Sequence, residues 1–269
     1  MTTSPLRDRR YRPTDPSARL GAAAAALYDA FAAERFDPDP PRCPHCVSEV
    51  DVRAMGGDVH ELAPAALGRF ILKAGTTWGG IADLRRVVPR ALELSADHQL
   101  PVSRDVLWDR LAEARWRTWS EPQVAAIRAF LLAEWARLVR TEPRNAHRAH
   151  RWLADLAPTG EALGPFLDDW HNALGPLTAR PHQQAAILHL VALLTNSPLR
   201  PDVPGTVADV LPGDPAGADA LRDWLVNPAT NLELQRGTEV FAGTRHARRV
   251  DLAGERLLRY RLAVERAEP

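Results

Sequence analysis

The chain has 269 residues, of which 45% are hydrophobic and 25% charged, and its 34 basic side chains balance 34 acidic ones. This is the composition of an ordinary globular protein, and the zero net charge excludes a generally basic nucleic-acid binder and a generally acidic tail protein. Two cysteines are too few for a disulfide-stapled secreted fold. Because the sequence shows neither a signal peptide nor an apolar run of about 20 residues, we expect a cytoplasmic protein without membrane contact.

The N-terminal 18 residues predict a disordered arm. Three prolines and four arginines occur among them, with little apolar sequence. The remaining residues, 19–269, predict one helical domain.

Apolar residues at helical spacing predict a first helix over 18–35. The Asp37-Pro38-Asp39-Pro40-Pro41 segment ends it, because successive prolines lack the backbone donor and clash with the preceding turn. Proline and glycine then punctuate a series of helical stripes. The predicted helices cover about 61–74, 81–96 (kinked or split at Pro89), 103–119, 121–142, 145–158, 161–174 and 178–196.

Two later segments are less regular. Five prolines make 198–219 a possible internal break, either a long loop or a linker. Residues 246–265 fit both a strand and a helical stripe. We prefer a helix there, because no partner strand is evident and an isolated strand is unstable.

Together these segments predict an all-α fold, either a multi-helix bundle or a short HEAT-like stack of helical hairpins. Tryptophans support a helical repeat, since Trp119, Trp135, Trp152 and Trp170 follow one another at about one per helix. The alternative is that each helix of a bundle needs one large apolar anchor.

Cys43-Pro44-His45-Cys46 is the motif with the clearest chemistry. It is identical to the active-site tetrapeptide of the periplasmic DsbA thiol oxidases, which implies thiol–disulfide exchange. Against this, the sequence shows neither an export signal nor the strand that precedes such a motif in a thioredoxin-like fold.

Zinc is a second interpretation of the same pair. Thiolates three residues apart bind one Zn²⁺ together, but a closed site needs two more ligands. His45 or His60 would supply them, or two chains would share one ion. In the third interpretation, Cys43 and Cys46 are reduced thiols that pack locally.

A basic stripe spans a helix end and the start of the next helix. It consists of Arg137, Arg140, Arg144, Arg148 and Arg151. Guanidinium groups in a row suit bidentate capture of carboxylates, so the stripe predicts an acidic protein segment as partner, ahead of nucleic acid. The alternative is a solvated helix face in an arginine-rich chain.

One resemblance rests on several short strings. They are Tyr28-Asp29-Ala30-Phe31, Cys43-x-x-Cys46, Thr77-Trp78-Gly79, Leu84, Pro89-Arg90-Ala91-Leu92-Glu93-Leu94, and the segments around Trp116, Trp119 and Trp135. With these strings, residues 25–140 resemble a family of bacterial all-α proteins that have no assigned activity. The resemblance therefore implies no catalytic residues and only groups the thiol pair with the helices that follow it.

These observations predict a non-enzymatic helical scaffold that binds a protein partner. The first alternative is a zinc-binding or thiol-redox protein using Cys43 and Cys46. A further alternative is an enzyme whose His, Asp and Arg residues converge only in space.

Overall fold

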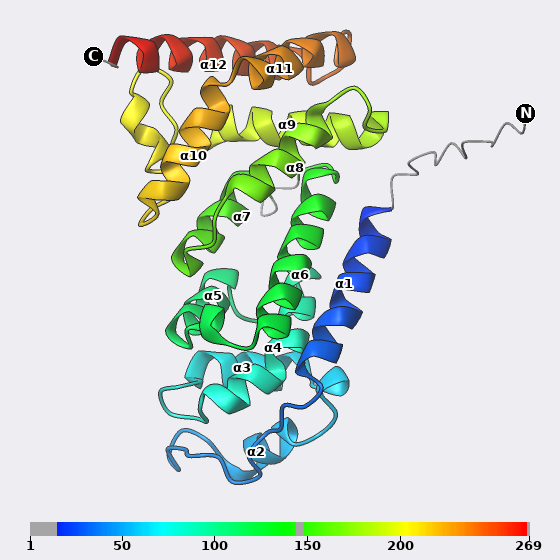
Figure 1. The fold of residues 1–269 in the computed structure, drawn as a ribbon, viewed down its shortest axis with the longest axis vertical. Helices are drawn as coiled ribbons and strands as arrows, with labels where there is room; N and C mark the ends of the chain where they lie inside the picture. Colours follow the sequence, from blue (N-terminus) through cyan, green and yellow to red (C-terminus); the bar gives the residue numbers. More distant parts are fainter. Residues whose placement is uncertain (1–14, 144–147, 268–269) are drawn as a thin grey trace, which may run out of the picture.

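The computed structural model describes residues 15–143 and 148–267 (Figure 1). Twelve α-helices and four short 3-10 turns make up the regular structure of this part of the chain, which has no β-strand. The predicted all-α class is confirmed. The helices are α1 Pro16–Phe31, α2 Glu49–Met55, α3 Pro64–Lys73, α4 Ile81–Ala96, α5 Arg104–Glu113, α6 Glu121–Val139, α7 Ala149–Leu156, α8 Gly164–Leu174, α9 Arg180–Asn196, α10 Pro215–Val226, α11 Pro228–Val240 and α12 Ala247–Ala267.

The first helix begins two residues earlier than the sequence predicted. Helix α1 begins at Pro16, inside the predicted arm, because the Asp15 side chain accepts a hydrogen bond from the Ser17 N–H at 3.2 Å and caps the helix. The rest of the predicted arm, residues 1–14, lies outside the described residues.

Two predictions about helix continuity have clear outcomes. Helix α4 runs through Pro89 and is not split there, and the Pro89 ring is buried on its inner face. At the C-terminus, α12 confirms that a helix and not a strand covers the ambiguous segment.

The molecule is elongated, with α2 and α3 near one end, α11 and α12 at the other, and α1 lying along α6 (Figure 1). The evenly spaced tryptophans converge on a shared core. Trp135 lies 5.2 Å from Trp152 and 5.5 Å from Trp170, while Trp170 stacks on Trp224 at 4.9 Å between ring centroids. A common aromatic core accounts for one tryptophan per helix, and a true helical repeat stays a prediction.

The proline-rich 198–219 segment contributes to the same core. Leu199, Val207 and Leu211 are buried, and a 3-10 turn at Pro204–Val207 packs against α10 and α12. One of its carbonyl groups also binds α12, since Arg256 donates to the Leu199 carbonyl at 3.0 Å.

None of the described helices is long and apolar enough to cross a bilayer.

Candidate thiol site

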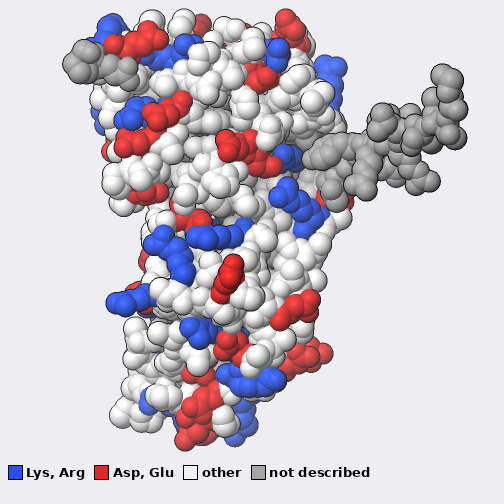
Figure 2. All heavy atoms as spheres, in the orientation of Figure 1, with Lys and Arg blue, Asp and Glu red and all other residues white. Residues whose placement is uncertain are grey.

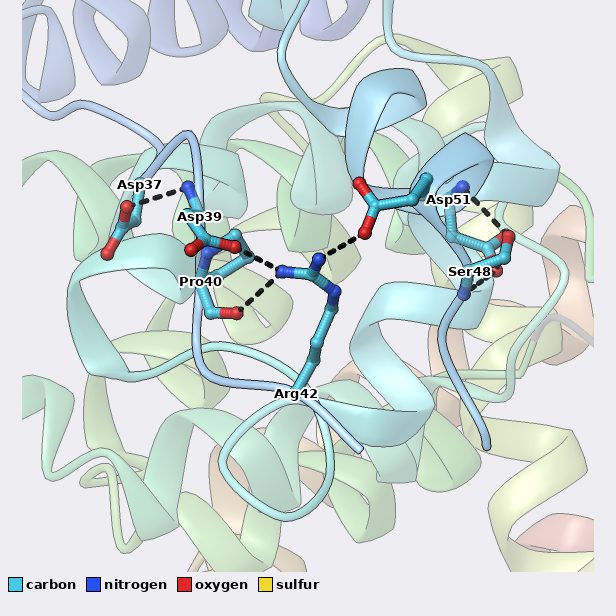
Figure 3. A network of polar contacts seen from close by, with 7 residues as sticks. Asp37, Asp39, Pro40, Arg42, Ser48 and Asp51 are labelled. Carbon is cyan, nitrogen blue, oxygen red and sulfur yellow. Dashed lines mark hydrogen bonds and ion pairs between the residues drawn. The ribbon is translucent and has the colours of Figure 1, made fainter. Parts of the chain in front are cut away.

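Cys43 and Cys46 lie in a turn between α1 and α2 that we call the thiol loop, residues 42–48. Arg42 holds its two flanks together, donating to Asp39 on one side and to Glu49 on the other, each at 2.5 Å (Figure 3). On the far flank, Ser48 and Asp51 form a reciprocal capping box that starts α2. Both ends of the thiol loop are therefore fixed by local polar contacts.

Backbone hydrogen bonds join the thiol loop to the turn that follows α3. The Cys43 N–H donates to the Thr77 carbonyl at 2.9 Å, and the Gly79 N–H donates to the Pro41 carbonyl at 2.8 Å. Trp78 anchors this second turn, because it is buried edge-on against Phe70 at 5.2 Å. A rigid aromatic contact in the core thus supports the backbone that carries Cys43.

Asp83 links the same turns to α4. This buried carboxylate accepts the Asp37 N–H at 2.9 Å and the Gly80 N–H at 2.8 Å. Buried backbone donors are costly when unpaired, so Asp83 fixes both the chain entering the thiol loop and the start of α4.

Lys73, the last residue of α3, contacts the thiol loop directly. Its ammonium donates to the carbonyl of Cys46. Its own carbonyl accepts the N–H groups of Thr76, Thr77 and Trp78, at 3.0–3.1 Å. One residue therefore positions both the loop that holds the thiols and the turn that pairs with it.

The two thiols differ in acidity. A hydrogen bond from Cys46 and the backbone N–H of His45 lower the pKa of Cys43, with a smaller contribution from the Lys73 charge. The same hydrogen bond and the charge of Cys43 raise the pKa of Cys46. Cys43 is half-buried and Cys46 is exposed. Of the two thiols, Cys43 is therefore the more acidic one and Cys46 the less acidic one.

The structure does not gather the four predicted metal ligands at one point. The exposed His45 supplies its backbone N–H to Cys43, whereas His60 stacks on the Tyr28 ring at 3.9 Å and lines a separate cavity of about 510 Å³. Among the described residues, no three His, Cys, Asp or Glu side chains come close enough to hold a metal ion. A zinc site within one chain thus lacks ligands in this part of the structure, and zinc binding stays a prediction.

Sequence reasoning missed Arg42 and Lys73. It also did not connect the turn that follows α3 with the thiols. The composition did single out Lys73: it is the one lysine among 34 basic residues, and all the others are arginine.

Two members of the predicted arginine stripe form ion pairs with other helices. Arg137 donates to Asp97 at 3.0 Å beside the end of α4, and Arg140 holds Asp169 of α8 through two bonds of 2.6 and 3.0 Å. Arg148 precedes α7 and Arg151 is exposed on it. Arg144 lies outside the described residues. Two of the five guanidinium groups are thus engaged by different helices, and capture of an acidic partner by this stripe stays a prediction.

Charges on the visible face of the molecule are mixed. Figure 2 shows basic and acidic side chains interspersed from end to end, without an extended area of one sign. Binding to nucleic acid depends on a broad basic surface, so this face does not favour it.

Away from the thiol loop, a polar cleft of about 330 Å³ lies between α4, α5 and α7. His98, Arg104, Arg148 and Asp155 line it together with Trp152. Burial raises the pKa of Asp155, and Arg104 is engaged with the buried Glu134 at 2.6 Å. His, Asp and Arg side chains meet in this cleft, as the enzyme hypothesis requires, but they also meet in two other hollows, one beside His60 and one beside His171. The enzyme hypothesis stays a prediction.

Comparisons with family models, with curated proteins and with solved structures find no match to this chain. The assignment of function therefore depends on the geometry of the site.

Proposed function

We propose that this protein works by thiol–disulfide exchange at Cys43 and Cys46, with the helical fold serving as a rigid support. One observation carries the proposal: two free thiols lie three residues apart in one accessible turn, and their interaction lowers the pKa of Cys43 and raises that of Cys46. Exchange needs one nucleophilic thiolate and one resolving thiol, and the chain supplies both.

In the first step the Cys43 thiolate attacks one sulfur of a partner disulfide. A mixed disulfide forms, the partner's S–S bond breaks, and the departing partner thiolate takes a proton from solvent. In the second step Cys46 loses its proton and attacks the Cys43 sulfur, so that the Cys43–Cys46 disulfide forms and the second partner thiolate leaves and is protonated. The partner disulfide gains two electrons and two protons, and the cysteine pair loses the same. The reverse sequence oxidises a partner dithiol.

The test uses reduced protein and the neutral probe hydroxyethyl disulfide, followed by mass spectrometry. We expect the wild type to lose two hydrogens as the Cys43–Cys46 bond forms. Cys46→Ser is expected to accumulate the mixed disulfide, and Cys43→Ser is expected to react at the slow rate of an ordinary exposed thiol. Equal rates for Cys43→Ser and wild type would contradict the proposal.

Zinc shared between two copies is the second candidate. What favours it is that two thiols three residues apart point from one turn, with a backbone N–H directed at the Cys43 sulfur. Four thiolates complete a tetrahedral zinc site, and two copies would supply them. This candidate predicts one zinc ion per two chains and a dimer that separates on chelation, measured by metal analysis and sedimentation. Zinc-free monomer after growth in zinc-supplemented medium would exclude it.

A further inference from the structure

The cations around the thiol loop differ in how they are paired. Arg42 is bound by Asp39 and Glu49, and Arg69 on α3 is bound by Asp51 at 2.8 Å. The Lys73 ammonium donates to a carbonyl oxygen and forms no ion pair within the described part of the chain, although the Asp51 carboxylate acts on it from a greater distance. Lys73 is thus the cation beside the thiol loop that no carboxylate holds in direct contact.

This charge lies where an incoming disulfide must approach. Lys73 holds the carbonyl of Cys46, and its ammonium acts electrostatically on the sulfur atoms of both cysteines. Lys73 is half-exposed and Cys46 is exposed, so a partner group that reaches the thiols also reaches this ammonium.

We infer that Lys73 makes the thiol loop selective for disulfides that carry a negative charge beside the S–S bond. The inference rests on the proposed exchange reaction and names its substrate class: an acidic disulfide, whether in a protein segment or in a small molecule. A free thiolate repels such substrates, since both carry negative charge. The Lys73 ammonium offsets that repulsion, because the attraction between opposite unit charges about 7 Å apart in water is worth about a threefold change in rate.

The experiment compares three probes of similar size: dithiodiglycolate with two negative charges, neutral hydroxyethyl disulfide, and cystamine with two positive charges. Each rate with reduced protein is divided by the rate with dithiothreitol at the same pH and low salt. The wild type is expected to favour dithiodiglycolate over hydroxyethyl disulfide at least threefold and to disfavour cystamine. The preference is expected to shrink at 1 M salt, where charges are screened.

Three variants separate the role of Lys73 from net charge. Lys73→Gln is expected to lose the preference, and Lys73→Arg to keep it because the charge is retained. Arg53→Gln removes one charge from an exposed position of α2 and is expected to leave the preference unchanged. Circular dichroism checks that each variant is folded.

The results distinguish a failure of the exchange function from a failure of the charge selectivity. If hydroxyethyl disulfide reacts no faster with the wild type than with Cys43→Ser, the exchange function is wrong. If exchange proceeds but the three probes give equal relative rates, or Lys73→Gln keeps the wild-type order, the exchange function stands and the selectivity inference is overturned.

Discussion

The backbone N–H of Ala149 donates a hydrogen bond to Nδ1 of the buried His189 imidazole at 3.1 Å. Because Nδ1 accepts, the proton is on Nε2, which lies 2.9 Å from the Thr141 carbonyl. The ring therefore bridges the end of α6 and the start of α7 only while it is neutral. Burial lowers its pKa from 6.5 to about 4.

Acid sensitivity follows from this histidine and from His150. Burial and the neighbouring charge of Arg148 also lower the pKa of His150 to about 4. Between pH 6.5 and 4 the unfolded chain binds protons that the folded chain does not, so the free energy of unfolding falls as pH falls, by about 1.4 kcal/mol per pH unit for each histidine. Below about pH 4 both states are protonated and this loss levels off. Urea unfolding at pH 7, 6 and 5 measures the slope.

His150→Leu isolates one of the two contributions. Nδ1 of His150 is buried without a partner, so leucine removes the titration without breaking a hydrogen bond of that atom. We expect the slope to fall by about half and the free energy of unfolding at pH 7 to be maintained. An unchanged slope in His150→Leu would contradict the assignment.

The two thiols are expected to react with iodoacetamide in different pH ranges. Since the pKa of Cys43 is lowered and that of Cys46 is raised, alkylation of Cys43 should rise at lower pH than alkylation of Cys46. Cys46→Ala removes the main hydrogen bond to Cys43 and should move the Cys43 profile to higher pH. Peptide mass spectrometry after short pulses gives both profiles. Coincident profiles in the wild type would show that the thiols are equivalent.

The Arg104–Glu134 ion pair crosses from α5 to α6, and its side chains are only 14% and 6% exposed. Removing one partner leaves an uncompensated charge, so Glu134→Leu should lower the free energy of unfolding by about 3 kcal/mol. The double variant Arg104→Met with Glu134→Leu should cost less than Glu134→Leu alone. For comparison, Asp219→Ala in the exposed Arg222–Asp219 pair should change it by less than about 1 kcal/mol. Additive single effects in the double-mutant cycle would rule out the coupling.

Sequence patterns predicted the helical architecture well, because prolines and apolar stripes act locally. They missed α2, α10 and α11. The seven residues of α2 depend on the Ser48–Asp51 capping box and on contact with α3, because a helix this short is unstable alone. They also predicted a kink or a split at Pro89, but α4 runs through this residue and buries its ring.

The sequence identified only some of the residues of the candidate site. Cys43 and Cys46 lie three residues apart and were found. Lys73 contacts the thiol loop, and Asp83 contacts the segment before it, through tertiary contacts over 27 and 46 residues, which no local pattern encodes. The same holds for the arginine stripe: Asp97 and Asp169, which engage Arg137 and Arg140, come from other helices and could not be foreseen from the local sequence.

Two glycines form a matched pair for testing the packing. A Cβ at Gly68 in α3 would lie 2.7 Å from Cγ of Pro101, whereas a Cβ at Gly254 in α12 would meet nothing within 4 Å. Gly68→Ala should therefore lower the free energy of unfolding by about 1–3 kcal/mol. Gly254→Ala should raise it by about 0.5–1 kcal/mol through helix propensity. Thermal or urea unfolding of both variants checks this, and equal effects would contradict the close approach of α3 to Pro101.

The single lysine restricts where amine-reactive reagents can modify a side chain of this protein. Apart from the α-amino group, Lys73 is the one primary amine that an acylating reagent can modify. Any acetyl group or amine-reactive dye placed on a side chain would therefore sit beside Cys43 and Cys46, and would at once remove the ammonium that holds the Cys46 carbonyl. A single tag at Lys73 would therefore lie next to the thiol loop and would also alter its contacts.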